Sequence, residues 1–175
     1  KLTSVTLSEN LESIGNYAFY NCSSLTNIII PNSVTTIGDY AFYGCSYLTN
    51  ITIPDSVTSI GKAAFAGCSK LTSVTLSENL ESIGNHAFEA CSFLTNITIP
   101  NSVTTIGAYT FYGCSKLTSV TLSENLESIG NYAFGRCSFL TNIIIPLSVT
   151  AIGEDAFYGC SSLKIIYCEA ESKPV

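Results

Sequence analysis

The sequence lacks methionine and tryptophan altogether, and its 175 residues include one histidine and only seven lysine and arginine residues. A surface that binds nucleic acid needs clustered basic residues, whereas here they are scattered through a chain of net charge -6. One histidine and the absence of any C-x-x-C pair argue against a zinc site. No apolar run approaches the ~20 residues that span a bilayer. We therefore expect no nucleic-acid partner, no metal or other cofactor, and no insertion of this segment into a membrane.

The start of the chain carries no targeting signal. Lys1 stands directly before the first repeat leucine, with no initiator methionine, apolar leader or cleavage site ahead of it. We therefore expect the chain to be a fragment of a longer protein, and its compartment has to be inferred indirectly.

Repetition is what the chain has in abundance. A 23-residue unit occurs seven times between residues 2 and 162, and residues 163–175 read as a closing strand and a tail. A fixed period of this length predicts a solenoid, in which each unit covers the apolar face of the next. We expect a single domain over residues 1–175.

Each unit predicts a strand, a turn and an outer segment. Leu25, Ile28 and Ile30 end in the alternation of a short strand, which would pair with equivalent strands in a parallel sheet. Next comes a turn marked by proline in four units and by Ser-Glu-Asn in three. Then an isoleucine-glycine pair reverses the chain, and an Ala-Phe pair has the spacing of a short helical or 3₁₀ turn. The prolines are Pro31, Pro54, Pro100 and Pro146, and the Ser-Glu-Asn turns are 8–10, 77–79 and 123–125.

The unit resembles a known repeat family. The pattern C-x-x-L-x-x-I-x-I-P-x-S-V-x-x-I-G-x-x-A-F runs from Cys22 to Phe42 and again from Cys45 to Phe65. It is similar to the leucine-rich repeats of the BspA-like surface proteins of bacteria and some parasitic protists, and residues 165–174 look like the closing segment of such arrays. The resemblance implies an α/β repeat solenoid that is right-handed and curved. A parallel sheet would line its concave face, and short helical or 3₁₀ turns or loops would lie on the convex face.

The cysteines recur once per unit, which places them in a column along the solenoid. Two interpretations remain open: disulfides between neighbouring units, for which side chains pointing in parallel suit the S–S torsion poorly, and small buried thiols beneath the sheet, which we favour. Cys168 falls where Ile145 lies one unit earlier and receives the same interpretation. The column contains Cys22, Cys45, Cys68, Cys91, Cys114, Cys137 and Cys160.

No pattern of catalytic residues stands out. His86 replaces a tyrosine found in most units and reads as a tolerated variant on an outer loop, and the paired glutamates of the Ser-Glu-Asn turns read as solvated loop charges. Three Asn-x-Ser/Thr sequons, at Asn21, Asn50 and Asn96, would carry glycans only in a eukaryotic secretory route. The sequence therefore predicts a protein that is not an enzyme.

The residues between the buried strand positions form the candidate binding face. They predict a wide, uncharged surface of hydroxyl and amide groups on the concave side, flanked by a third column running from Thr3 to Thr141. Such a face could dock an extended polypeptide or a glycan, or it could simply keep the sheet soluble. The face comprises Ser4, Thr6, Asn27, Ile29, Asn50, Thr52, Ser73, Thr75, Asn96, Thr98, Ser119, Thr121, Asn142 and Ile144.

Aromatic residues gather at the variable positions around the repeated phenylalanine and cysteine. They form either a second contact surface or packing between neighbouring turns, and we favour packing. The set is Tyr17, Tyr20, Tyr40, Tyr43, Tyr47, Phe93, Tyr109, Tyr112, Tyr132, Phe139 and Tyr158.

The leading functional hypothesis is an adhesion module, secreted or displayed on a cell surface, whose concave sheet binds proteins such as host or extracellular-matrix proteins. A structural spacer is the first alternative, because residues 1–19 are identical to residues 116–134. A carbohydrate-binding face is the second. The first strand has no polar cap, which also suggests end-to-end association of chains.

Overall fold

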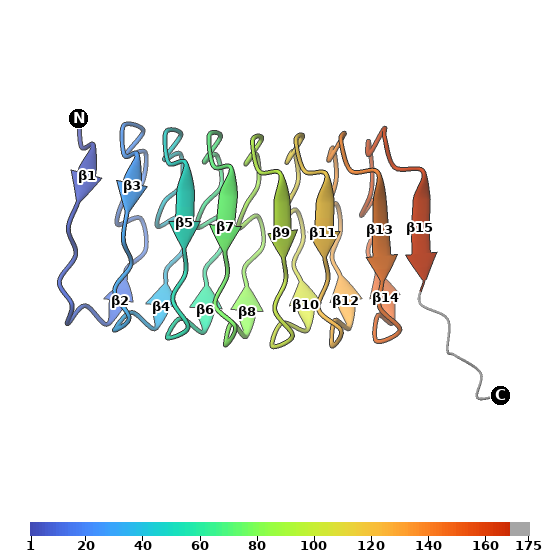
Figure 1. Cartoon of the computed structure of the whole chain (residues 1–175), viewed down its shortest axis with the longest axis horizontal. Coiled ribbons are helices and arrows are strands. Elements are labelled where there is room, and N and C mark those ends of the chain that lie inside the picture. The colour runs from blue at the N-terminus through green and yellow to red at the C-terminus, as the bar shows by residue number, and fades with distance from the viewer. Residues whose placement is uncertain (169–175) are drawn as a thin grey trace.

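The computed structural model describes residues 1–168, which form seven turns stacked in one row and closed by a final strand (Figure 1). One row of strands begins the turns: β1 (Ser4–Val5), β3 (Asn27–Ile28), β5 (Asn50–Thr52), β7 (Ser73–Thr75), β9 (Asn96–Thr98), β11 (Ser119–Thr121), β13 (Asn142–Ile145) and β15 (Ile165–Cys168). A second row runs the opposite way: β2 (Ser13–Ile14), β4 (Thr36–Ile37), β6 (Ser59–Ile60), β8 (Ser82–Ile83), β10 (Thr105–Ile106), β12 (Ser128–Ile129) and β14 (Ala151–Ile152).

Strand pairing follows the repeat without a slip. Every pairing is parallel and joins residues 23 positions apart, for example Asn50 with Ser73 in the first row and Thr36 with Ser59 in the second. The predicted closing strand is β15, in which Cys168 aligns with Ile145 as expected. The tail and most of the family-like ending fall on residues 169–175, outside the described residues. Equivalent side chains therefore lie in straight files along the row.

The core consists of such files. Ile51 is buried between exposed Asn50 and Thr52, which is the period-two pattern of a strand with one buried face. The repeated phenylalanines form a continuous stack, with ring centroids 5.1 Å apart between Phe42 and Phe65 and 5.4 Å apart between Phe65 and Phe88. Each turn therefore completes the core of its neighbours, and the array is stabilised by stacking.

The prediction of helical or 3₁₀ turns was wrong. Residues 1–168 contain no helix, and the Ala-Phe segment is a series of hydrogen-bonded turns. The Ala18 N–H donates to the Gly15 carbonyl of its own turn, whereas the Phe19 N–H donates to the Ala41 carbonyl of the next turn, at 2.7 Å. Tyr17 has a φ of 59°, in the left-handed region. A helix needs consecutive bonds within its own segment, and here every second N–H goes to the neighbouring turn.

The bonds between the Ala-Phe segments of neighbouring turns form a third ladder, beside those of the two rows of strands. Near this ladder the backbones of neighbouring turns approach closely. A Cβ atom on Gly84 would lie 2.6 Å from both the Gly61 carbonyl carbon and the Lys62 nitrogen of the preceding turn. The recurring glycine is therefore explained by a contact between turns. In the described part of the chain, no helix is long and apolar enough to cross a membrane.

Candidate functional site

The predicted binding residues share one surface, here called the strand face, on the outward side of the first row of strands. All fourteen are exposed, and pairings such as Thr52 with Thr75 and Asn96 with Ser119 place them in files. Most are polar, and the two exceptions, Ile29 and Ile144, are 76% and 52% exposed. The strand face is thus an uncharged polar surface with two exposed apolar side chains.

The flanking threonine column is held by its own hydrogen bonds. The Thr72 hydroxyl donates to the Thr49 carbonyl and the Thr118 hydroxyl to the Thr95 carbonyl, both at 2.9 Å. The Asn50 amide in turn donates to the Thr49 hydroxyl at 3.2 Å. These side chains already have hydrogen-bond partners within the chain, and such fixed positions lower the entropy cost of binding.

The strand face carries clefts that the sequence analysis missed. Three of them lie where a Ser-Glu-Asn turn precedes a proline turn, and each is lined by a glutamate and a proline: Glu9 with Pro31, Glu78 with Pro100, and Glu124 with Pro146. Their volumes are about 200, 250 and 200 Å³. A fourth, of about 320 Å³, lies between the proline turns of the second and third units. The alternation of the two turn types was the signal available in the sequence.

Hydrogen bonding explains the positions of two of these clefts, those of Glu78 and Glu124, whereas at the Glu9 cleft β1 and β3 do pair. The Glu78 N–H donates to the Asp55 side chain at 3.0 Å, and the Asn79 amide donates to the Asp55 carbonyl at 2.9 Å. Such bonds hold the Ser-Glu-Asn turns 77–79 and 123–125 against the proline turn before each of them. At the first of these two junctions, β5 and β7 pair over three residues. On its other side β7 forms no ladder with β9, so the cleft opens there.

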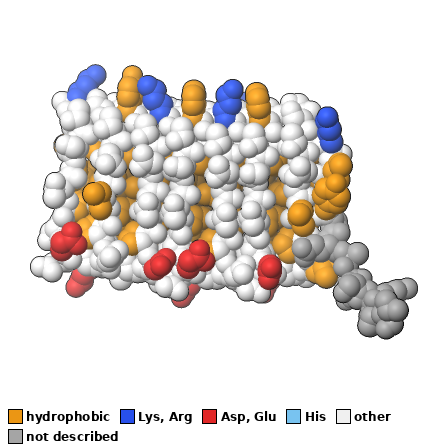
Figure 2. Space-filling view, viewed as in Figure 1, with side chains coloured by type: hydrophobic (Ala, Val, Ile, Leu, Met, Phe, Trp, Pro, Cys, Tyr) orange, Lys and Arg blue, Asp and Glu red, His pale blue; other side chains and the backbone are white. Residues whose placement is uncertain are grey.

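Charge is divided between the two edges of the strand face. Lysines Lys1, Lys70 and Lys116 precede their strands, and glutamates Glu9, Glu78 and Glu124 follow the same strands. Figure 2 shows basic side chains along one edge and acidic side chains along the other. Aromatic rings alternate with the lysines: the Lys70 ammonium lies 3.8 Å from the Tyr47 ring centroid, and that of Lys116 lies 4.5 Å from the Phe139 centroid. We call these the lysine edge and the acidic edge.

The outer tyrosines stack between turns. Tyr17 and Tyr40 have parallel rings 5.0 Å apart, as do Tyr20 and Tyr43. The hydroxyl of Tyr132 donates to Asp155 at 2.6 Å, and this hydrogen bond raises the pKa of Tyr132 to about 12. Packing between neighbouring turns is therefore a role these rings have in the structure.

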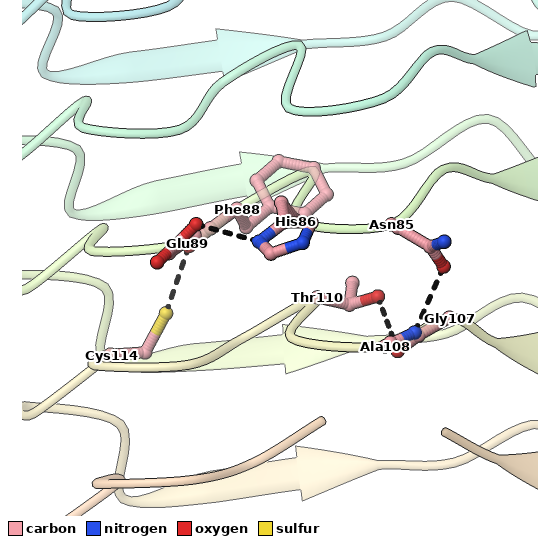
Figure 3. Close-up of polar contacts among 8 residues, drawn as sticks. All are labelled: Asn85, His86, Phe88, Glu89, Gly107, Ala108, Thr110 and Cys114. Carbon is pink, nitrogen blue, oxygen red and sulfur yellow. Dashed lines mark hydrogen bonds and ion pairs between the residues drawn. The ribbon is translucent and has the colours of Figure 1, made fainter. Parts of the chain in front are cut away.

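His86 belongs to the same outer file. Its ring lies on that of Tyr109, with centroids 4.8 Å apart, and its Nδ1 is 2.8 Å from the Glu89 carboxylate (Figure 3). Nearby, Thr110, which replaces the usual alanine, is buried and donates to the Gly107 carbonyl at 2.9 Å. Residues 1–168 hold no group of three histidine, cysteine or acidic side chains that could bind a metal ion.

The sequon asparagines lie in two places. Asn50 and Asn96 are on the strand face, where each amide donates to the threonine before it. Asn21 lies in an outer turn with a φ of 56°, and its N–H donates to the Tyr43 carbonyl.

The seven predicted thiols form one column of free cysteines. Five are buried, and Cys22 and Cys160 at the two ends are half-buried. Each thiol from Cys45 onward donates to a phenylalanine carbonyl one turn back, as Cys114 does to Phe88 at 3.2 Å (Figure 3). Burial raises the pKa of the Cys45 and Cys114 thiols to about 12. The Cys168 side chain lies outside the described atoms.

Comparison with family models gives the classification. Residues 1–106 and 82–173 match a model described as "BspA type Leucine rich repeat region", with six copies. The chain belongs to this family of BspA-type leucine-rich repeats. Proteins of the family are typically secreted or on the cell surface of bacteria, leucine-rich repeat domains generally bind proteins, and their solenoids are typically non-enzymatic.

Solved structures agree. A leucine-rich cell surface protein from Faecalibacterium prausnitzii is 38% identical, with a TM-score of 0.79, over 93% of this chain and 44% of its own. A leucine-rich repeat protein from Bacteroides ovatus is 34% identical, with a TM-score of 0.80, over 94% of this chain and 48% of its own. A T. pallidum leucine-rich repeat protein is 32% identical, with a TM-score of 0.88, over 92% of this chain and 78% of its own.

The chain therefore spans less than half the length of the F. prausnitzii and B. ovatus proteins. A comparison with curated proteins finds no match.

Proposed function

We propose that this chain is a non-enzymatic binding module, secreted or displayed on a cell surface, that engages protein partners through the strand face. The observation that carries the proposal is the unbroken set of exposed files, which crosses all seven turns and is indented by clefts. An extended polypeptide could contact several turns at once.

The size and spacing of the clefts favour such a ligand. Pockets for small molecules commonly hold about 300–1,000 Å³, and three of the four clefts are smaller. They recur along the array, so a chain-like ligand would fill several of them. Ile29 and Ile144, each lining a cleft, offer apolar contacts within the polar face.

The test is a pair of matched double variants. Asn50→Arg with Asn96→Arg places two cations on the strand face, and Thr36→Arg with Ser82→Arg places two cations at the same separation on the second row of strands, where Thr36 and Ser82 are exposed. Binding would be measured against immobilised extracellular-matrix and serum proteins. We expect the first variant to lose at least about tenfold in affinity and the second to bind as the original chain does.

The other outcomes separate the alternatives. Equal affinity for both double variants would rule out the strand face. A signal on a glycan array without any protein ligand would favour carbohydrate binding through the same face.

A spacer role is the second candidate, because residues 1–19 and 116–134 are identical and a site tailored to one partner usually diverges from its neighbours. If the chain binds neither proteins nor glycans, the spacer proposal replaces the binding proposal.

A further inference from the structure

Among residues 1–168, the charged side chains on the two edges of the strand face form no ion pairs with other residues. The one ion pair in this part of the chain is that of His86 with Glu89. Lys70 and Glu78 belong to the same turn but are eight residues apart along a nearly extended segment, about 26 Å at ~3.3 Å per residue. The lysine edge and the acidic edge therefore face outward in opposite directions (Figure 2).

Every turn with a lysine on the lysine edge also has glutamates on the acidic edge, and the third turn adds Asp55 to the acidic edge. Lysines stand in the first, fourth and sixth turns, and the same turns carry the glutamates Glu9, Glu78 and Glu124, with a second glutamate three residues further on. The separations are 69 and 46 residues, which correspond to three turns and two turns, or about 14 and 10 Å at ~4.8 Å per turn.

We propose that two copies of this chain associate side by side and in parallel, with the lysine edge of one against the acidic edge of the other and equivalent turns aligned. In this register all three lysines face glutamates. Antiparallel copies could match all three only with Glu9, Asp55 and Glu124, and this would turn the two strand faces to opposite sides of the contact. A parallel shift by one or more turns would match at most two, even with Asp55 counted.

Two of the turns without an edge lysine agree with the same register. In the seventh turn Phe139 lies on the lysine edge and is 49% exposed, and Leu147 takes the matching position on the acidic edge and is 56% exposed. Leu147 replaces the asparagine or aspartate of the other proline turns, so the exposed apolar side chain occurs where the neighbour would present a phenylalanine. In the third turn Tyr47 would face Asp55, a carboxylate that can accept its hydroxyl.

This contact is head-to-tail: a pair of copies keeps one unused lysine edge and one unused acidic edge, so further copies add laterally into ribbons. Exposed ion pairs are individually weak and are screened by salt. The association should therefore be strongest where copies are concentrated, as on a surface. This inference goes beyond the proposed binding of other proteins, and it leaves the strand face open.

Charge reversal gives the test. Lys70→Glu with Lys116→Glu makes both edges acidic, whereas Glu78→Lys with Glu124→Lys reverses one glutamate of each acidic pair. In sedimentation of the whole chain at low ionic strength we expect the original chain to associate and each double variant to do so at least about tenfold more weakly. An equal mixture of the two variants should recover association, because the reversed edges then complement each other. At about 1 M salt, where the screening length is about 3 Å, association should be lost.

The register is tested separately with a carbodiimide, which joins a lysine amine to a carboxylate in direct contact. Mixed light and isotope-labelled chains should give intermolecular links from Lys70 to Glu78 or Glu81, and from Lys116 to Glu124 or Glu127. Links from Lys70 to Asp55 or Glu124, association unaffected by the charge reversals, variants whose mixture stays monomeric, or an original chain that stays monomeric at low salt would each overturn the proposal. Circular dichroism of both variants checks that they are folded, and the recovery in the mixture does so independently.

Discussion

Replacing a glycine of the repeated isoleucine-glycine pair should have opposite effects in different turns. At Gly84 a new Cβ would meet backbone atoms of Gly61 and Lys62 at 2.6 Å, where carbon atoms ordinarily keep about 3.5–4.0 Å. At Gly15, in the first turn, no atom lies within 4 Å of the Cβ position, and the residue is outside the left-handed region. The same substitution can therefore be made with and without the contact between turns.

The magnitudes follow from these contacts. To admit the Cβ at Gly84, two turns must separate by roughly 1 Å, which would break the 2.8 Å bond from the Gly84 N–H to the Ile60 carbonyl. Overpacking costs about 1–3 kcal/mol and the lost bond about 0.5–1.5 kcal/mol, while the lower entropy of the unfolded chain returns about 0.4–1 kcal/mol. Gly84→Ala should thus destabilise the protein by about 0.5–4 kcal/mol. Gly15→Ala should stabilise it by about 0.4–1 kcal/mol.

Urea unfolding followed by circular dichroism measures both changes. Gly107→Ala is a graded control, because the nearest atom in the way is the side-chain oxygen of Asn85, which can move. We expect its cost to fall between the other two. If Gly84→Ala were as stable as the original chain, or if Gly15→Ala lost as much stability, the close approach of the turns would not be the reason for the glycine.

Two further predictions concern the core. Phe88→Ala should cost about 3–5 kcal/mol of unfolding free energy, because Phe88 is fully buried between Phe65 and Phe111. Phe19 is only half-buried, so Phe19→Ala should cost less. Similar losses for both variants in urea unfolding would argue against a continuous stack. Burial raises the pKa of Cys114 from 9.0 to about 12, so between these pH values the unfolded state loses the proton first and stability falls as pH rises, by up to about 1.4 kcal/mol per pH unit. In Cys114→Ala the unfolding free energy should fall less steeply with pH, by up to this amount per pH unit. A fall between pH 9 and 12 as steep as in the original chain would contradict the burial of the thiol.

The period of the sequence predicted the register, because one residue of slip would turn every buried strand side chain outward. Ile51, Asn50 and Thr52 show this directly, since the apolar residue is enclosed and its polar neighbours are exposed. The straight files of the strand face follow from the same rule.

The outer segment could not be predicted in the same way. Alanine and phenylalanine fit a helix as well as a turn, and the deciding factor is the bond from the Phe19 N–H to Ala41, a residue of the next turn. Contacts between turns also decide where the clefts open, since the bonds from Glu78 and Asn79 to Asp55 close one junction and leave the next open. A pattern within one unit does not contain this information, whereas the order of the turn types along the chain does.

The identical bonding of successive turns sets how such a protein can change its length. Adding or deleting 23 residues would carry every ladder, the phenylalanine stack and the thiol column intact from one turn to the next, so whole units can be gained or lost while the remaining turns fold as before. Inserting one or two residues within a strand would instead interrupt all three ladders at that point. Recombination between stretches as alike as residues 1–19 and 116–134 would produce changes of the tolerated kind, and it would move the lysine and glutamate of a turn together.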